Sequence, residues 1–110
     1  MPSPARIRST ISTLVDQPDE LRHLRVFHKA LADVNRLRIV RRLAAGEASV
    51  TELIEHVGLS QPLVSWHLGR LRAAGIVETR RSGRETLCRL RPESLDEMAA
   101  RQRAFLTVDG

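Results

Sequence analysis

Two short helical segments separated by a glycine constrain this chain more than any other feature. Ser49 is followed three residues later by Glu52, a spacing typical of a capping box at a helix N-terminus. Gly58 predicts the end of that helix, and Ser60 has the residue type that caps the next one. Residues 49–74 are therefore predicted to form a helix-turn-helix, whose second helix runs from about residue 60 to 74.

The second helix has one face to bury and one to expose. Val64, Leu68 and Leu71 share the predicted buried face. Short polar side chains near the N-terminus of the other face allow close approach to base edges in the DNA major groove, where Gln pairs with adenine and Ser reaches a base or a phosphate. The candidate DNA-contacting residues on this helix are Ser60, Gln61, Pro62, Ser65, Trp66 and Arg70.

After Gly75 the apolar pattern changes from helical to alternating. Residues 76–80 and 84–90 are candidate strands on either side of Ser82-Gly83, which is a hairpin signal. The predicted hairpin, within residues 76–91, carries Arg81 and Arg84 near its tip. Both are candidate contacts to DNA phosphates or to the minor groove.

Helices are predicted on both sides of this core. Apolar spacing indicates helices near residues 7–15 and 21–33, and another in which Leu37, Val40, Leu43 and Ala44 face inward. A last helix over residues 93–107 carries an apolar stripe from Leu95 to Leu106. We expect one domain over residues 1–110, mainly α with a small β-hairpin, in which segments 1–18 and 93–107 form the interface of a twofold dimer.

The charge is basic and unevenly distributed. The chain has 18 Lys and Arg against 13 Asp and Glu, a net charge of +5. Residues 60–91 hold seven Arg and two Glu, which equals that whole net charge. A local excess of cations favours a polyanionic partner, although a merely solvated surface would look the same.

Other classes of function find little support in the sequence. It has no Gly-rich phosphate loop and no recognisable nucleophile–base pattern, so no enzyme is predicted. One cysteine, Cys88, fits a reducing compartment. Because the sequence has no signal peptide and no membrane-length apolar run, we expect a cytoplasmic protein that does not associate with a membrane.

Residues 27–90 resemble the ArsR/SmtB family of winged-helix repressors, most clearly in ALADVNRLRIVRRL, LSQPLVSWHLGRLRAAGIV and TRRSGR. The resemblance implies a homodimer that binds double-stranded DNA at a roughly palindromic operator and is released by an inducer. It also implies that Gln61, Pro62, Ser65 and Trp66 contact DNA and that Arg81 and Arg84 lie in the wing.

The sequence departs from the metal-sensing members of that family. Positions that often carry a Cys-x-Cys pair read Ala48-Ser-Val-Thr51, and residues 93–106 contain no His. A soft-metal site needs two or more thiolates, so we expect no metal and no cofactor. The alternative is a metal site across a dimer interface, to which three histidines and a carboxylate would contribute: His23, His28 and His56 with Glu20 or Glu55. A small-molecule or redox inducer stays open, as do two alternative functions, a protein-interaction module and a sequence-neutral architectural DNA binder.

Several residues allow two interpretations. Trp66 is expected near DNA rather than packed on the scaffold, and His67 is expected to be a packed, hydrogen-bonded residue rather than a base reader. Cys88 lies on the more apolar strand face, which favours a buried, inert thiol over a redox switch. The run Arg36, Arg38, Arg41 and Arg42 fits phosphate contacts and a solvated, acid-paired helix face equally well.

Overall fold

The computed structural model describes residues 18–107, and the expected helix near residues 7–15 lies outside them. The elements follow one another as α2 (Pro18–Leu31), α3 (Val34–Ala44), β1 (Ala48–Ser49), α4 (Val50–Val57), α5 (Gln61–Ala73), β2 (Val77–Ser82), β3 (Glu85–Leu90) and α6 (Pro92–Leu106). The predicted mainly helical fold with a helix-turn-helix, α4–α5, and a hairpin wing, β2–β3, is confirmed.

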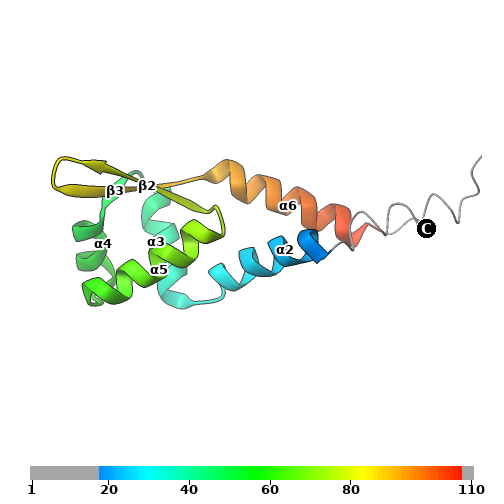
Figure 1. Cartoon of the computed structure of the whole chain (residues 1–110), viewed down its shortest axis with the longest axis horizontal. Helices are drawn as coiled ribbons and strands as arrows, with labels where there is room; N and C mark the ends of the chain where they lie inside the picture. The colour runs from blue at the N-terminus through cyan, green and yellow to red at the C-terminus, as the bar shows by residue number, and fades with distance from the viewer. Residues whose placement is uncertain (1–17, 108–110) are drawn as a thin grey trace, which may run out of the picture.

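Figure 1 shows the arrangement of these elements. Helices α3, α4 and α5 form a compact group beneath the wing, whereas α2 and α6 run side by side away from it. The ends of α2 and α6 that lie farthest from the wing expose the apolar side chains Leu21 and Leu106. The wing and the α2–α6 pair therefore occupy opposite ends of the described chain.

Local capping sets the boundaries of the helix-turn-helix. Ser49 Oγ accepts a hydrogen bond from the Glu52 amide at 3.1 Å, and Glu52 Oε1 accepts one from the Ser49 amide at 3.3 Å, so the predicted capping box is present. Gly58 ends α4 in the left-handed conformation at φ 71°, where a side chain would be strained. Ser60 caps α5 by accepting from the Leu63 amide at 3.4 Å.

The sheet has three strands rather than the predicted two. β1 is only two residues long and pairs antiparallel with β3, with Ala48 opposite Cys88 and Ser49 opposite Leu87. It was missed because two residues cannot show an alternating pattern and their partner lies forty positions away. The hairpin turns at Gly83, whose φ of 62° fits the first central position of a type II′ turn.

The core lies between the helices and the sheet. As predicted, Val64, Leu68 and Leu71 of α5 are buried. On α3 the prediction was half right, because Leu43 is buried and Val40 packs against the core. Ile39 is fully buried together with Leu43, whereas Leu37 is 48% exposed and Ala44 is exposed. The buried residues of the main core are Phe27, Ala30, Ile39, Leu43, Ala48, Leu53, Val57, Val64, Leu68, Leu71, Ile76, Val77 and Cys88.

Part of the α6 stripe packs against this core. Leu95 and Met98 contact it as half-buried side chains, whereas Leu106 is exposed. Helix α6 also begins at Pro92, one residue earlier than predicted, because proline is well tolerated in the first turn of a helix. No helix among residues 18–107 is both long and apolar enough to cross a membrane.

Candidate nucleic-acid interface

A groove separates α5 from the wing, and it gathers side chains that are distant in the sequence. Its volume is about 330 Å³. Gln61 and Ser65 line it from α5, and Arg81 and Arg84 line it from the wing. The structure thus brings four of the predicted contact residues to one site. The other residues that line it are Val50, Thr51, Ile54, Leu68, Arg72, Thr79, Glu85 and Thr86.

The start of α5 faces solvent at one end of this groove. Ser60, Gln61 and Pro62 are all exposed, and Pro62 lies in the first turn of the helix. Pro62 has no amide hydrogen and the Leu63 amide donates to Ser60, so the Gln61 amide and the helix dipole are what favour an anion at this end. The first turn can therefore accept a phosphate while Gln61 and Ser65 remain available to base edges.

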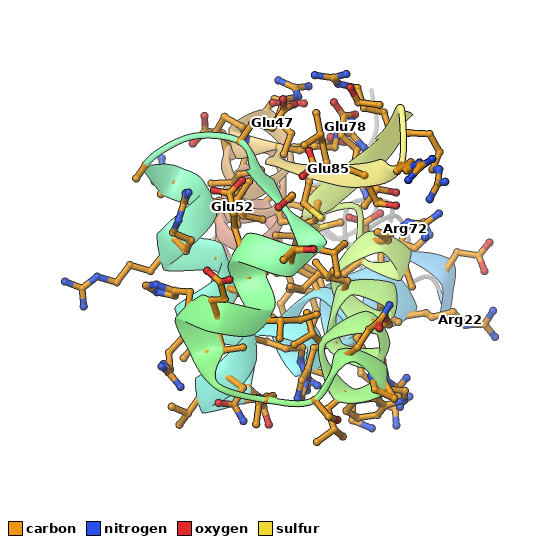
Figure 2. All side chains as sticks on the ribbon, turned by 90° about the vertical axis from the view of Figure 1, so that its left-hand side faces the viewer. Arg22, Glu47, Glu52, Arg72, Glu78 and Glu85 are labelled. Atoms are coloured by element: carbon orange, nitrogen blue, oxygen red, sulfur yellow. The ribbon has the colours of Figure 1, made fainter. Side chains whose placement is uncertain are left out.

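Arg72 was not among the predicted contact residues, although it lines the same groove. It follows Ser65 by seven residues, which is two helical turns, so the two side chains share one side of α5. Figure 2 shows Arg72 projecting from α5 below the wing strand that carries Glu85. The period of α5 was the signal that could have found Arg72.

The arginines of the wing divide between two faces. Arg80 pairs with Glu47 at 2.8 Å, and Arg89 donates to Glu78 at 2.6 Å, so both are neutralised outside the groove. Contact with Glu78 raises the pKa of Arg89 above its usual range. Arg81 donates to Thr86 Oγ1 at 3.3 Å, which orients its guanidinium within the groove. Arg81 and Arg84 are thus the arginines through which the hairpin tip can meet a phosphate.

Trp66 lies on the flank of α5 that faces away from the wing. Its side chain is 52% exposed, and its ring is flanked by the guanidinium carbons of Arg36 and Arg70 at 5.5 and 5.2 Å from the ring centroid. Both distances fall within the range of cation–π contacts. The ring is thus in contact with two cations and half exposed to solvent.

His67 is buried, and its Nδ1 accepts a hydrogen bond from Arg36 Nη1 at 3.1 Å. Its predicted structural role is confirmed. Nearby, Asp33 caps α3 by accepting from the amides of Asn35 and Arg36 at 2.9 and 3.1 Å. The hydrogen bond from the Arg36 amide, helped by the Arg36 charge, lowers the pKa of Asp33 below its usual value.

The arginine run on α3 serves mainly to hold the fold together. Arg36 donates to two carbonyl groups at the end of α2, and Arg38 donates to the carbonyls of His56 and Val57 at 3.1 Å. Arg42 pairs with Glu52 at 3.3 Å. The Arg41 side chain is exposed and makes no hydrogen bond or ion pair with any residue in 18–107.

Cys88 is fully buried in the sheet, and burial raises the pKa of its thiol to about 11. The predicted burial is confirmed, and a thiol that stays protonated at neutral pH is a poor nucleophile. Across residues 18–107, no group of three or more His, Cys, Asp or Glu side chains could hold a metal ion.

Comparisons with known proteins converge on one family. A profile described as "Bacterial regulatory protein, arsR family" matches residues 33–79. A probable mercury resistance operon repressor of Streptomyces lividans is 44% identical over 59 residues, which cover 54% of this chain and 47% of the relative. The chain thus spans about half the length of the curated relatives it matches.

This chain covers a larger share of the length of two solved structures. HlyU from Vibrio cholerae N16961 matches with a TM-score of 0.64 at 30% identity, over 83% of this chain and all of the relative. The homodimeric winged helix-turn-helix DNA-binding domain of a possible ArsR-family regulator from Mycobacterium bovis matches with a TM-score of 0.66 at 31% identity, over 76% of this chain and 78% of the relative.

Proposed function

Because the chain belongs to the ArsR family of bacterial regulatory proteins, we propose that it is a sequence-specific DNA-binding transcriptional repressor. It binds a pseudo-palindromic operator in double-stranded DNA as a homodimer, and an inducer of unidentified chemistry releases it. Regulation then follows from occupancy of the operator, without catalysis, in the cytoplasm where bacterial DNA lies.

The groove shared by α5 and the wing carries this proposal. Gln61 and Ser65 present hydrogen-bonding groups from a helix of the width that the major groove admits. Arg81 and Arg84 present cations on the other side of the groove, where they can meet DNA phosphates. Base readers and phosphate binders on two neighbouring elements are what sequence-specific recognition requires.

Dimerisation would cover the apolar side chains that are exposed at the end of the molecule farthest from the wing. Leu21 of α2 and Leu106 of α6 are exposed there, and the M. bovis relative is a homodimer. A twofold axis near α6 would set the two copies of α5 about one DNA turn apart, roughly 34–36 Å. The groove lies between α5 and the wing. The far ends of α2 and α6 lie at the other end of the described chain (Figure 1), so a dimer formed there leaves the groove open.

The test compares two substitutions on two DNAs by fluorescence anisotropy. The DNAs are a fragment from upstream of the protein's own gene and a scrambled duplex of equal length. Gln61→Ala removes a base reader, so we expect it to weaken binding to the native fragment more than to the scrambled one. Arg84→Ala removes a phosphate contact, so it should weaken both alike and reduce the salt slope by about 1.

Arg41→Ala is the matched control, since it removes the same charge from an exposed residue outside the groove. Equal losses on both DNAs for Gln61→Ala would contradict the assignment of α5 as the recognition helix. Equal affinity of the unsubstituted protein for both DNAs would point to an architectural binder, and no binding would point to a protein-interaction module. Repeating the titration in zinc and then in chelator tests a metal inducer.

A further inference from the structure

A second hollow lies on the opposite flank of α5, between that helix and α2. Its volume is about 360 Å³, and no Asp or Glu lines it. Four cationic side chains and the indole of Trp66 surround a floor of small apolar residues. The residues that line this cleft are Arg25, Val26, Lys29, Ala30, Ala32, Arg36, Trp66, Arg70 and Ala73.

The centre of the cleft is held rigid before any ligand arrives. Arg36 Nε donates to the Ala30 carbonyl at 2.8 Å, Nη2 to the Lys29 carbonyl at 3.2 Å and Nη1 to His67 at 3.1 Å. Its guanidinium also lies over the Trp66 ring. A cation fixed by three hydrogen bonds loses little conformational freedom when an anion binds.

The four cations of the cleft lack carboxylate partners. Within residues 18–107, no ion pair involves Arg25, Lys29, Arg36 or Arg70. Elsewhere the fold does neutralise its arginines, for example through the pairs Arg42–Glu52 and Arg80–Glu47. A cluster of like charges around a hollow that no carboxylate lines attracts an anion.

Helix α2 carries further cationic side chains in line with those of the cleft. Arg22, Arg25 and Lys29 are spaced by three and four residues, which places them on one helical face. Figure 2 shows Arg22 of α2 and Arg72 of α5 projecting toward the same side of the molecule. Arg22 therefore continues along α2 the row of cations that Arg25 and Lys29 place in the cleft.

We propose that this cleft binds a phosphodiester group of the DNA backbone beside the half-site read by α5, which makes α2 a third DNA-contacting element. The inference rests on the proposed function. In a dimer formed through α6, which lies beside α2, the bound phosphate is on the side of the half-site nearer the operator centre. Contact there adds affinity without base specificity.

The first test measures the salt dependence of binding to a duplex of about 30 base pairs recovered by in vitro selection with the full chain, and to a scrambled duplex. Each lost phosphate contact lowers the slope of log K against log salt by about 0.9. Arg25→Ala and Lys29→Ala should each lower the slope on both duplexes, and the double variant should lower it by about 0.9, the value for one phosphate. Arg41→Ala should leave the slope unchanged, and Arg25→Lys should restore most of it.

The second test replaces single phosphates of the selected duplex with uncharged methylphosphonates. Wild-type protein should lose affinity at one or two linkages on the inner side of each half-site, whereas the Arg25/Lys29 double variant should be insensitive at those same linkages. Equal sensitivity of the two proteins at every linkage would overturn the proposal. In that case, if Gln61→Ala still abolishes the preference for the selected duplex over the scrambled one, only the phosphate site is refuted and the proposed repressor function stands.

The third test distinguishes DNA from a free anion as the source of the phosphate. Trp66 is the only tryptophan of the chain, so its emission reports on the cleft. Sodium pyrophosphate should change that emission only at millimolar concentration and in competition with DNA. Saturation at micromolar pyrophosphate, with an unchanged salt slope in the double variant, would make the cleft a small-anion site and overturn the DNA assignment.

Discussion

Ser49 and Ser60 allow one substitution to be tested in two environments. Each caps a helix of the helix-turn-helix through a hydrogen bond from a backbone amide to its hydroxyl, at 3.1 Å for Ser49 and 3.4 Å for Ser60. They differ in burial, since Ser49 is 2% exposed within the sheet whereas Ser60 is exposed. Replacing both by alanine separates the cost of a lost cap from the loss of a DNA contact.

The expected magnitudes follow from that difference. Losing an N-cap costs about 0.5–2 kcal/mol of unfolding free energy. Ser49→Ala should lie near the upper limit, about 1.5–2 kcal/mol, because the Ser49 side chain that makes this bond is buried. Ser60→Ala should cost about 0.5 kcal/mol, because its bond is long and water replaces it. For a domain of this size these values lower Tm by about 10 °C and about 3 °C.

The DNA affinities should rank the two variants in the opposite order. Well below its Tm, Ser49→Ala should bind operator as wild type does. Ser60→Ala loses the hydrogen bond that the Ser60 hydroxyl is expected to make to DNA. Such a bond contributes about 1 kcal/mol, or roughly fivefold in Kd. The assays are urea unfolding at fixed protein concentration and anisotropy at 15 °C. If Ser60→Ala destabilised the fold as much as Ser49→Ala, or if folded Ser49→Ala lost DNA affinity, the reasoning would be refuted.

Three further predictions concern the fold and its titration. Ile39→Ala should lower the unfolding free energy by about 2–5 kcal/mol, whereas Leu37→Ala, on a half-exposed position, should cost less than about 1 kcal/mol in the same urea titration. The pKa of Asp33 is lowered in the folded state, so its charge stabilises the fold above about pH 4. The stability advantage of wild type over Asp33→Asn should shrink as pH falls below that value, and a constant difference from pH 7 to 3 would contradict this. Burial raises the pKa of Cys88 to about 11, so its contribution to stability is complete below about pH 9 and is lost between pH 9 and 11. Ellman's reagent at pH 8 should label Cys88 only when urea unfolds the protein, and rapid labelling of the native protein would contradict its burial.

The sequence predicted well the features that depend on neighbouring residues. The capping box at Ser49, the Gly58 stop and the Ser60 cap are each set by contacts within four positions, and all three are present. The same holds for the hairpin, whose turn follows from Gly83. Four predicted contact residues line the groove because Gln61, Ser65 and the wing arginines belong to those locally determined elements, whereas Arg72 was missed.

What the sequence could not predict depends on distant partners. On α3 two faces are apolar enough to be buried, and contact with the rest of the core selects Ile39 over Leu37. Strand β1 exists only because β3 lies beside it. The cleft between α2 and α5 likewise joins residues forty positions apart, so no window of the sequence contains it.

The double role of Ser49 has a mechanical consequence. Ser49 is the last residue of β1 and the N-cap of α4, so no hinge residue separates the sheet from the helix-turn-helix. At the other end of the sheet only Arg91 separates β3 from α6. We therefore expect that a displacement of α6 rotates the wing and the recognition helix together as one rigid unit. An inducer that acts at the subunit interface would then change the distance between the two DNA-binding surfaces of the dimer without changing the shape of either surface.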